Sequence, residues 1–484
     1  MKATLLSLFL ILSLTSVFAH NATQNEVFPE LKGPLIEVNA DEKITIRMIP
    51  HSHDDIGWLK TIDQYYINSE KSITIQGVQY ILDSVFPVLN MDPKKKFMYV
   101  EMGFFQRWWE EQEKDMQDLV KKLLKNGQIE FVNGGYCMND EATVYYEDTI
   151  DQMTMGHQFL LETFGITPQT GWHIDPFGHA NAQAALFAQM GFKSFFFSRI
   201  DYQDKDKRLK ENSMEMVWIP ETSQGIENAM FTHVNYYHYS HPDGFNFDII
   251  GSDQPIQDNP KYSGYDVPKR ADAFVAWFRT MRQSYLSTDL CHTAGEDFHF
   301  MAAHIDFKNY DKLFKYIRNS PNYKVEVQYN TPIEYINAIY PQNKKYPVKT
   351  DDFFPYADGT DAYWTGYFTS RTSYKGYVRK SGKFLQAVRR LASQTLWEKS
   401  STFVSNNFAQ IDKALLVLED AMAMAQHHDA VTGTARHLVT EDYKFHLARG
   451  TNNVTQVILW VLYEIYNVIR NSLLLITGKR STRT

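Results

Sequence analysis

The sequence predicts an α/β fold, in which a mostly parallel sheet with surrounding helices forms a barrel-like βα domain, followed by a three-helix bundle. Two observations support this prediction. Short apolar runs alternate with longer helical patterns from residue 43 to residue 339, and this alternation is typical of a parallel sheet covered by helices. Beyond Tyr340-Pro341 the strand patterns stop, and three helical stretches joined by short polar loops follow, as in a small bundle.

The predicted strands are short runs rich in β-branched and aromatic residues. The first, Lys43 to Met48, alternates apolar and polar side chains, as a strand does. The others are 96–101, 128–132, 169–174, 193–198, 214–219, 229–234, 288–293 and 323–328. Ligand sites in parallel sheets collect at the carboxyl ends of the strands. Polar residues that directly follow these runs are therefore the first candidates for function.

The helical patterns lie between the strands and after them. They cover 69–89, 104–125, 149–163, 179–190, 270–284, 310–319, 332–339, 374–399, 408–426 and 438–449. Residues 240–269 are rich in Gly, Pro, Asp, Asn and Tyr, which predicts a long surface loop of the kind that is often functional. The expected organisation is an α/β domain at 42–340, a three-helix bundle at 341–450 and an apolar helical tail of unknown role at 451–484.

The amino terminus has the features of a secretory signal peptide. Met1 to Ala19 combines Lys2, a leucine-rich apolar run and a small-residue cleavage pattern. The secretory route would make Asn21 and Asn453, each in an Asn-x-Thr triplet, available for glycosylation. We therefore expect a glycoprotein of the secretory pathway, placed in the lysosome or vacuole or secreted.

Composition excludes several other classes. The net charge of −8 and the pI of about 6.1 do not suggest nucleic acid or an anionic membrane surface as a partner. Residues 456–476 are apolar, but Glu464 and Arg470 argue against a membrane span. The two cysteines, Cys137 and Cys291, lack the spacing of a cysteine metal site. Their pairing and the oligomeric state, a homo-oligomer included, stay open.

The first polar cluster follows the first predicted strand. In an extended segment His51, His53 and Asp55 can face one side together, and Asp54 the other. An imidazole and a carboxylate two residues apart at a strand end suit a divalent metal with nitrogen and oxygen ligands, zinc being typical. A solvated, histidine-rich turn would show the same pattern, because such triplets are common by accident.

Two further clusters place carboxylates after later strands. Asp175 ends one strand and is followed by Pro176, so it is a metal ligand, a nucleophile or a helix cap. Glu296 and Asp297 follow the strand at 288–293. Beside a cleft, one of these two carboxyl groups would have a raised pKa and act as a proton donor. In isolation, Glu-Asp is usually a solvated turn.

The fourth cluster lies at the carboxyl end of a bundle helix. His427, His428 and Asp429 are consecutive, and at a helix end they could form a cap stabilised by the helix dipole. They could also bring a metal ligand from outside the sheet domain. Paired histidines are uncommon, which favours ligation.

Five motifs, in this order, carry a clear resemblance to a known family. They are His-Ser-His-Asp-Asp-Ile-Gly-Trp, Trp-His-Ile-Asp-Pro-Phe-Gly-His, Gly-Glu-Asp-Phe, Tyr-Trp-Thr-Gly-Tyr-Phe-Thr-Ser-Arg and Gln-His-His-Asp-Ala-Val-Thr-Gly-Thr. Together they resemble the class II α-mannosidases of glycoside hydrolase family 38, and the lysosomal α-mannosidase branch most of all. The likeness covers about residues 44 to 450.

The resemblance implies a catalytic site. Asp175 would be both zinc ligand and nucleophile, and Asp297 the general acid/base. Tyr239 is a further candidate for the sugar site. The implied zinc ligands are His53, Asp55, Asp175 and His428, and the implied sugar-binding residues are Trp58, Phe177, Arg199, Trp364, His427 and Asp429.

The implied reaction is the retaining hydrolysis of terminal α-D-mannose from N-glycan-type oligosaccharides. Retaining glycosidases use two carboxyl groups about 5–5.5 Å apart, one as nucleophile and one as acid/base. Zinc would bind adjacent mannose hydroxyls and keep the nucleophile ionised at acidic pH. The acid/base needs the opposite, a raised pKa.

Two other readings remain open. A metal-dependent carbohydrate deacylase also suits His/Asp clusters at strand ends, but it needs a metal-bound water in place of a nucleophilic carboxylate. A truncated, inactive glycan-binding homologue is the other reading. The family continues past the bundle with large β-domains, whereas this chain stops at Thr484.

Overall fold

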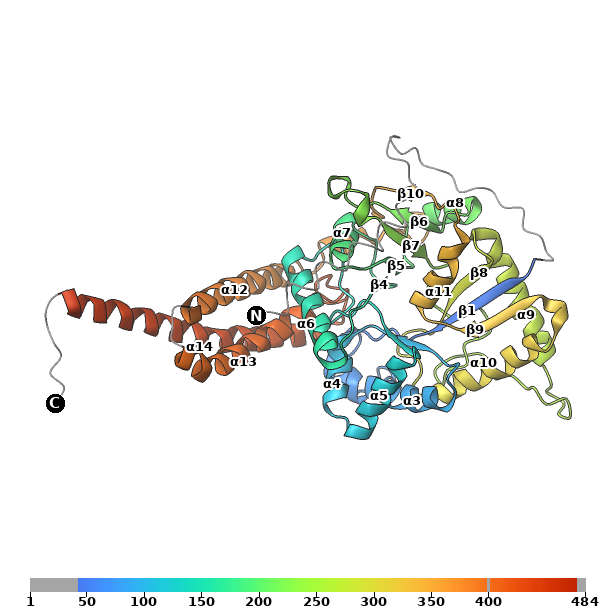
Figure 1. Cartoon of the computed structure of the whole chain (residues 1–484), viewed down its shortest axis with the longest axis horizontal. Coiled ribbons are helices and arrows are strands. Elements are labelled where there is room, and N and C mark those ends of the chain that lie inside the picture. Colours follow the sequence, from blue (N-terminus) through green and yellow to red (C-terminus); the bar gives the residue numbers. More distant parts are fainter. Residues whose placement is uncertain (1–41, 398–400, 477–484) are drawn as a thin grey trace.

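The computed structural model describes residues 42–397 and 401–476. An α/β body and a group of three long helices that projects from it make up the molecule (Figure 1). The sheets of the body are mostly parallel and are surrounded by helices, so the predicted fold class is confirmed. The predicted signal peptide and Asn21 lie outside the described residues.

The strand that leads to the first polar cluster lies in the middle of a parallel sheet. It is β1 (Ile44–Pro50), and it pairs on one side with β8 (Asp289–Ala294) and on the other with β9 (Val325–Tyr329). Ile44, Ile46 and Met48 are completely buried. Burial of alternate residues fixes the register of a strand, so the residues after β1 emerge at the carboxyl edge of this sheet.

The remaining strands form two more sheets. One has the order β10 (Val348–Lys349), β6 (Glu215–Trp218), β7 (Met230–Val234), β5 (Ser194–Phe197) and β4 (Thr170–His173). Only β6 and β7 pair antiparallel in it. The other sheet pairs β2 (Phe97–Tyr99) with β3 (Ile129–Phe131). A bridge between His51 and Met98 joins the end of β1 to β2, and a hydrogen bond from Asn133 N to Thr170 O joins the end of β3 to β4, so the three sheets are linked.

Ten α-helices belong to the described part of the body. They are α2 (Ile62–Ile67), α3 (Val78–Met91), α4 (Met102–Glu110), α5 (Lys114–Lys125), α6 (Tyr146–Phe164), α7 (Asn181–Gln189), α8 (Tyr202–Glu211), α9 (Val267–Met281), α10 (Ala303–Arg318) and α11 (Pro332–Ile339). The predicted loop at 240–269 contains no helix or strand from residue 240 to residue 266.

Two predicted helices differ from the structure and one helix, α8, was not predicted, each for a local reason. The helix expected at 104–125 is two helices, because the side-chain amides of Gln112 and Gln117 bond the carbonyls of Trp108 and Trp109 and end α4 there. The first part of the helix expected at 69–89 is a loop. The unpredicted α8 has no buried residue, so it lacks the apolar stripe by which helices are recognised.

A buried lysine explains the loop before α3. The Nζ atom of Lys60 donates to the carbonyl oxygens of Ser69, Thr74 and Gln76 at 2.8, 3.0 and 3.0 Å. These carbonyls are therefore not free for the helical ladder. Lys60 itself is completely buried, and hydrogen bonding to three carbonyls satisfies its three donors.

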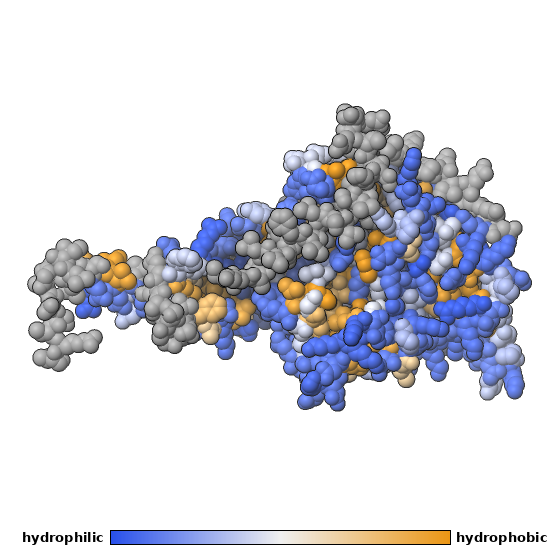
Figure 2. All heavy atoms as spheres, viewed as in Figure 1, coloured by the Kyte–Doolittle hydropathy of each residue, from blue (hydrophilic) through white to orange (hydrophobic). Residues whose placement is uncertain are grey.

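The helical part consists of α12 (Thr372–Trp397), α13 (Ser401–Ala425) and α14 (His437–Ile476). The helix α14 continues unbroken through residue 450 (Figure 1). Its far end exposes Leu459, Leu462 and Leu473 by more than half, whereas the body shows a mainly hydrophilic surface in the same view (Figure 2). None of the described helices is long and apolar enough to cross a membrane. Cys137 and Cys291 are both buried and unpaired.

Candidate active site

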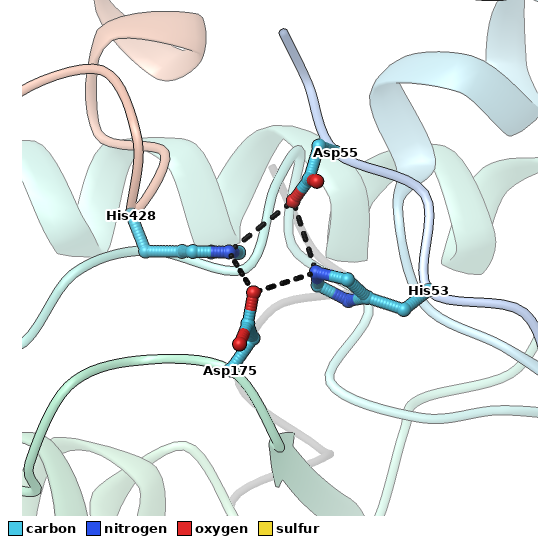
Figure 3. Close-up of side chains that lie close together, drawn as sticks. All are labelled: His53, Asp55, Asp175 and His428. Carbon is cyan, nitrogen blue, oxygen red and sulfur yellow. Dashed lines mark hydrogen bonds and ion pairs between the residues drawn. The ribbon is translucent and has the colours of Figure 1, made fainter. Parts of the chain in front are cut away.

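Four side chains from distant parts of the chain meet at one point. His53 and Asp55 follow β1, Asp175 follows β4, and His428 lies in the loop between α13 and α14. Figure 3 shows their nitrogen and oxygen atoms facing one another. All four residues are buried. The structure therefore brings together the four residues that the resemblance implies as zinc ligands.

The distances within this group are regular. His53 Nε2 lies 2.9 Å from Asp55 Oδ1 and 3.3 Å from Asp175 Oδ2. His428 Nε2 lies 3.2 Å from Asp55 Oδ1 and 3.1 Å from Asp175 Oδ2. Tetrahedral zinc with ligands at 2.0–2.1 Å has neighbouring ligand atoms about 3.3 Å apart. Two imidazoles and two carboxylates at this spacing fit zinc in donor type as well as in separation.

Unpartnered atoms support this fit. Among the described residues, His53 Nε2 and Asp55 Oδ1 are buried and make no well-formed hydrogen bond. Burial of such atoms is costly unless another partner compensates. A second overlapping group, Asp55, His427, His428 and Asp429, also has one ligand atom from each residue within 4.8 Å of the others. The cluster thus offers two neighbouring positions for a cation.

The backbone holds the two histidine ligands. The N–H of His53 donates to Glu296 O at 3.1 Å, and Phe298 N donates to His53 O at 2.8 Å, so the segments after β1 and β8 stay paired. His428 Nδ1 donates to the carbonyl oxygen of Met138 at 2.8 Å. Because a carbonyl can only accept, this bond leaves the Nε2 lone pair of His428 directed at the cluster.

Asp175 is held by an arginine. Arg199 Nε donates to Asp175 Oδ1 at 2.8 Å, and Nη2 donates to the same oxygen. Burial tends to raise the pKa of Asp175, but Arg199 and the two histidine ligands hold it well below its usual range. Oδ1 is thus occupied by the arginine, while Oδ2 faces His53 and His428.

Asp297 has the opposite environment. It lies beside His53, with which it forms a bridge, and its Oδ1 accepts a hydrogen bond from Tyr239 Oη at 2.9 Å. Burial, together with the charges of Asp55 and Asp175, raises the pKa of Asp297 to about 7, against the lowering effects of His53 and Tyr239. Two carboxyl groups with diverging pKa values therefore share one site.

The aromatic rings of Phe177 and Trp364 lie beside Arg199 and form one wall of the candidate site, the aromatic wall. The Arg199 guanidinium lies 4.9 Å from the ring centre of Trp364 and 5.7 Å from that of Phe177. The ring centres of Phe177 and Trp364 are 5.0 Å apart. The rings of Phe177 and His428 pack edge to face, with their centres 5.9 Å apart. Trp58 is half-buried, and its carbonyl accepts a hydrogen bond from Arg436 N, just beyond the histidine pair.

His427 and Asp429 lie beside Asp55. His427 Nε2 is 3.5 Å from Asp55 Oδ1 and 3.7 Å from Asp429 Oδ2. Asp429 also accepts a hydrogen bond from Thr434 Oγ1, and burial and neighbouring carboxylates raise its pKa to about 7. Both residues are thus placed next to the four central side chains.

The geometry removes one alternative. Strand alternation alone left His51 open as a ligand, but its Nε2 donates to the carbonyl oxygen of Tyr239 at 2.9 Å. Burial lowers the pKa of His51 to about 3. The His51 side chain therefore supports the backbone of Tyr239.

Two cations hold the loop of His428, Arg371 just before α12 and Lys375 in its first turn, and no sequence pattern singled them out. Arg371 Nη1 donates to Gly433 O at 2.8 Å and to Ala435 O. Lys375 Nζ donates to Thr432 O at 2.6 Å. Basic residues near the start of a polar helix carry no signal of this kind, because their carbonyl partners lie about sixty positions away in the chain.

Comparisons with known proteins agree with this geometry. The model "Glycosyl hydrolases family 38 N-terminal domain" matches residues 43–359, and "Alpha mannosidase middle domain" matches residues 362–464. Among solved structures, an alpha-mannosidase from Enterococcus faecalis has a TM-score of 0.66 at 15% identity, covering 88% of this chain and 43% of that one. An alpha-amylase from Thermotoga maritima has a TM-score of 0.50 at 10% identity, covering 88% and 96%. Both show a shared fold.

Curated relatives are much closer in sequence. Lysosomal alpha-mannosidase of Dictyostelium discoideum is 44% identical over 434 residues, 88% of this chain and 42% of the relative. Alpha-mannosidase of Canavalia ensiformis is 42% identical, covering 86% and 41%, and human lysosomal alpha-mannosidase is 43% identical, covering 84% and 40%. The chain thus spans about two fifths of the length of these relatives. Because the first family model covers well over half of its residues, the chain belongs to glycosyl hydrolase family 38.

Proposed function

We propose that this chain is a zinc-dependent retaining α-mannosidase that removes terminal α-D-mannose from N-glycan-type oligosaccharides. The observation that carries the proposal is the convergence of His53, Asp55, Asp175 and His428 on one point next to the buried Asp297. The similarity to proteins named alpha-mannosidases supports it.

The four converging residues would hold the zinc ion. The donor set and the spacing of 2.9–3.3 Å fit this metal. When bound, zinc supplies a positive charge that orients and polarises hydroxyl groups of the sugar. His427 and Asp429, the two members of the overlapping group that would not hold the zinc ion, would then be available to form hydrogen bonds with the same sugar.

Asp175 is the proposed nucleophile. Its lowered pKa means that the carboxylate is ionised, and Arg199 fixes its orientation through two hydrogen bonds to Oδ1. An ionised, oriented carboxylate can attack the anomeric carbon and form the covalent glycosyl intermediate of a retaining enzyme.

Asp297 is the proposed acid/base. Its raised pKa keeps the carboxyl group protonated in acidic solution, so it can donate a proton to the leaving oxygen. It would then take a proton from the water that releases the sugar. Tyr239, which donates to Oδ1, leaves the other oxygen of Asp297 for this transfer.

The aromatic wall would receive the sugar. Phe177 and Trp364 present ring surfaces beside Arg199, and such surfaces pack well against sugar C–H groups while polar neighbours fix the hydroxyls. Trp58, His427 and Asp429 complete the proposed binding residues.

We propose the lysosome or vacuole as the location, reached through the secretory pathway, since two of the relatives are named lysosomal. The predicted signal peptide agrees with that route. Asn453 is exposed on α14, so glycosylation at this site is part of the proposal.

The decisive experiment is hydrolysis of a chromogenic α-mannoside by this chain, with and without a zinc chelator. We expect activity that is lost on chelation and restored by zinc. Activity that persists unchanged after verified metal removal would contradict the mechanism. A folded, zinc-loaded chain that binds mannosides without hydrolysing them would instead favour the glycan-binding alternative.

A second measurement separates the glycosidase from a deacylase. A fluorinated mannoside that slows the second step should leave a sugar covalently attached to Asp175, detectable by mass spectrometry of the peptide. A deacylase uses a metal-bound water and leaves no such adduct. The absence of an adduct in an enzyme that turns over mannosides would rule out the proposed nucleophile.

A further inference from the structure

A buried carboxylate joins both ends of the segment that carries the proposed nucleophile. Glu141 Oε1 lies 2.7 Å from Nδ1 of His173 and 2.7 Å from Nδ1 of His179. Its Oε2 accepts a hydrogen bond from the backbone N–H of Ala180 at 2.7 Å. The Glu141 side chain is completely buried. Three short hydrogen bonds from one carboxylate therefore fix residues 173–180 at their start and at their end.

This segment lies outside regular secondary structure, and its other hydrogen bonds hold its middle, through Arg199 to Asp175 and from Tyr367 Oη to Phe177 O at 3.3 Å. The strand β4 ends at His173 and α7 begins at Asn181, so the residues between belong to neither element. Gly178 has φ of +112°, a conformation that residues with a Cβ rarely adopt. A bridge between His179 and Phe353 is the backbone pairing found here among the described residues. A loop of this kind needs side-chain bonds to hold one conformation.

The two imidazoles have no second polar partner among the described residues. Nε2 of His173 and Nε2 of His179 are buried without a hydrogen bond. The His173 ring packs against Phe187 and Phe195, and the His179 ring stacks on Phe197 at 4.0 Å. Their orientation therefore depends on Glu141 and on aromatic packing.

The chain segment of Glu141 also holds the fourth cluster. Met138 O accepts hydrogen bonds from both N and Nδ1 of His428, at 3.2 and 2.8 Å. Asp140 N donates to Gln426 O at 3.0 Å. Residues 138–141 thus contact both the helical part and the segment after β4, and they set the separation between His428 and Asp175.

We propose that Glu141 is a positioning residue that fixes the nucleophile segment, and hence Asp175, relative to His428. It acts through His173 and His179 and does not touch the substrate. The inference rests on the proposed function, because only that function makes the position of Asp175 decisive for a reaction.

A second buried glutamate provides a matched control. Glu215 Oε1 lies 3.0 Å from His233 Nδ1 and accepts a hydrogen bond from Tyr335 Oη. Like Glu141 it is buried and bonds a buried histidine, although it lies within strand β6 and its partner lies in β7. None of its described hydrogen bonds involves the four converging residues. Glu215→Gln should therefore cost stability through the same kind of bond without moving Asp175.

The experiment compares Glu141→Gln with Glu215→Gln in the full, zinc-loaded chain. Glutamine keeps the shape of the side chain but replaces one acceptor by an NH2 group, so one donor loses its partner. For Glu141→Gln we expect kcat on a chromogenic α-mannoside to fall about 10- to 100-fold, with KM nearly unchanged. Glu215→Gln should lower Tm by a similar amount and leave kcat as in the wild type.

Amide hydrogen exchange provides a readout that does not need activity. Glu141→Gln should exchange faster than the wild type at residues 173–180, and Glu215→Gln should not. Faster exchange in a chain whose wild type hydrolyses nothing would support the positioning role and defeat the proposed function. Unchanged exchange at residues 173–180, or a wild-type kcat, would overturn the positioning role. If Glu141→Gln does not fold, His179→Phe removes one of the three bonds while keeping a ring against Phe197, and it is subject to the same two measurements.

Discussion

Two buried groups of carboxylate and imidazole side chains, one within the α/β body and one completed by His428 of the helical part, differ in how their donors and acceptors are matched. In the Glu215 group, a single carboxylate oxygen receives donors from His233 and Tyr335. In the central group, two carboxylates and two imidazoles point their atoms at a common centre. The contacts of the first group are donor-to-acceptor bonds to one oxygen, whereas lone pairs converge in the second, which is the arrangement of a cation site.

The pKa values of the two histidines in the central group reflect this convergence. Burial alone would lower the pKa of His428, but hydrogen bonds to Asp175 and Asp55 raise it to about 10. The pKa of His53 is likewise raised well above its ordinary value, against burial, chiefly by Asp55. Two buried carboxylates that face each other thus demand positive charge between them. Zinc meets this demand in the proposed enzyme.

The largest expected effect comes from removing the convergence itself. His428 belongs to both candidate ligand groups. The variant His428→Ala should therefore lose zinc binding, measured as metal content after dialysis, together with mannoside hydrolysis. His53→Ala should also lose zinc and activity, whereas His427→Ala should retain zinc. Of these two histidines, only His53 belongs to the group with Asp175. The reverse result for His53 and His427 would place the metal in the other group.

The next effect separates the metal from the acid. Asp297→Asn should retain zinc but lower the hydrolysis of a mannoside with a poor leaving group about 10²- to 10⁴-fold, the usual contribution of a general acid. Much of the rate of the first step should return with a strongly acidic phenol as leaving group, which needs no proton. An equal loss for both substrates would show that Asp297 is not the acid.

A smaller effect tests the support of His428. Removal of the cations that bond the carbonyls of its loop, in Arg371→Ala or Lys375→Met, should weaken zinc binding about 10-fold, as loss of an outer support does. Arg389→Ala is the control, because Arg389 lies on α12, as Lys375 does, but pairs with Asp151 and Glu419. Competition with a zinc-binding dye gives the affinities. Equal zinc affinity in all three variants would mean that the loop does not depend on these bonds.

The smallest expected effect concerns a carboxylate outside both groups. Burial raises the pKa of Glu130 from 4.5 to about 7, against hydrogen bonds from Ile333 and Thr170. Because the folded pKa lies above the unfolded one, its contribution to stability is complete below about pH 4.5 and is lost as pH rises through 7. Glu130→Gln should therefore flatten the decline of the unfolding free energy over this range.

Urea unfolding at several pH values measures this decline. Glu326→Gln is a suitable control, because Glu326 is exposed and pairs with Lys43 at the surface. Parallel pH curves for the wild type and Glu130→Gln would contradict the prediction.

Much of the fold and of the central group could be predicted from the sequence, because the signals are local. Alternating burial marks β1, and His53 and Asp55 follow it directly. The choice between His51 and His53 could not be made from alternation, because both face the same side of an extended chain. It depends on a hydrogen bond from His51 to the carbonyl of Tyr239, almost two hundred residues away.

The residues that support the site were not predictable in this way. Glu141 lies in a polar turn, and its histidine partners are 32 and 38 positions away. Lys60 bonds carbonyl oxygens, a class of partner that every residue offers, so no residue type marks the contact. Local patterns thus predict elements and mark candidate ligands, the family resemblance selects among these candidates, and the supports arise from packing between distant segments.

Through His428, the helical part supplies one of the four converging side chains. The sheet body, taken through β10, contains three of the four converging residues, and the fourth arrives more than seventy positions later. A fragment cut between the two parts would keep a complete sheet and an incomplete coordination set. The unit that must be produced, stored and folded as one piece therefore runs from β1 to the start of α14.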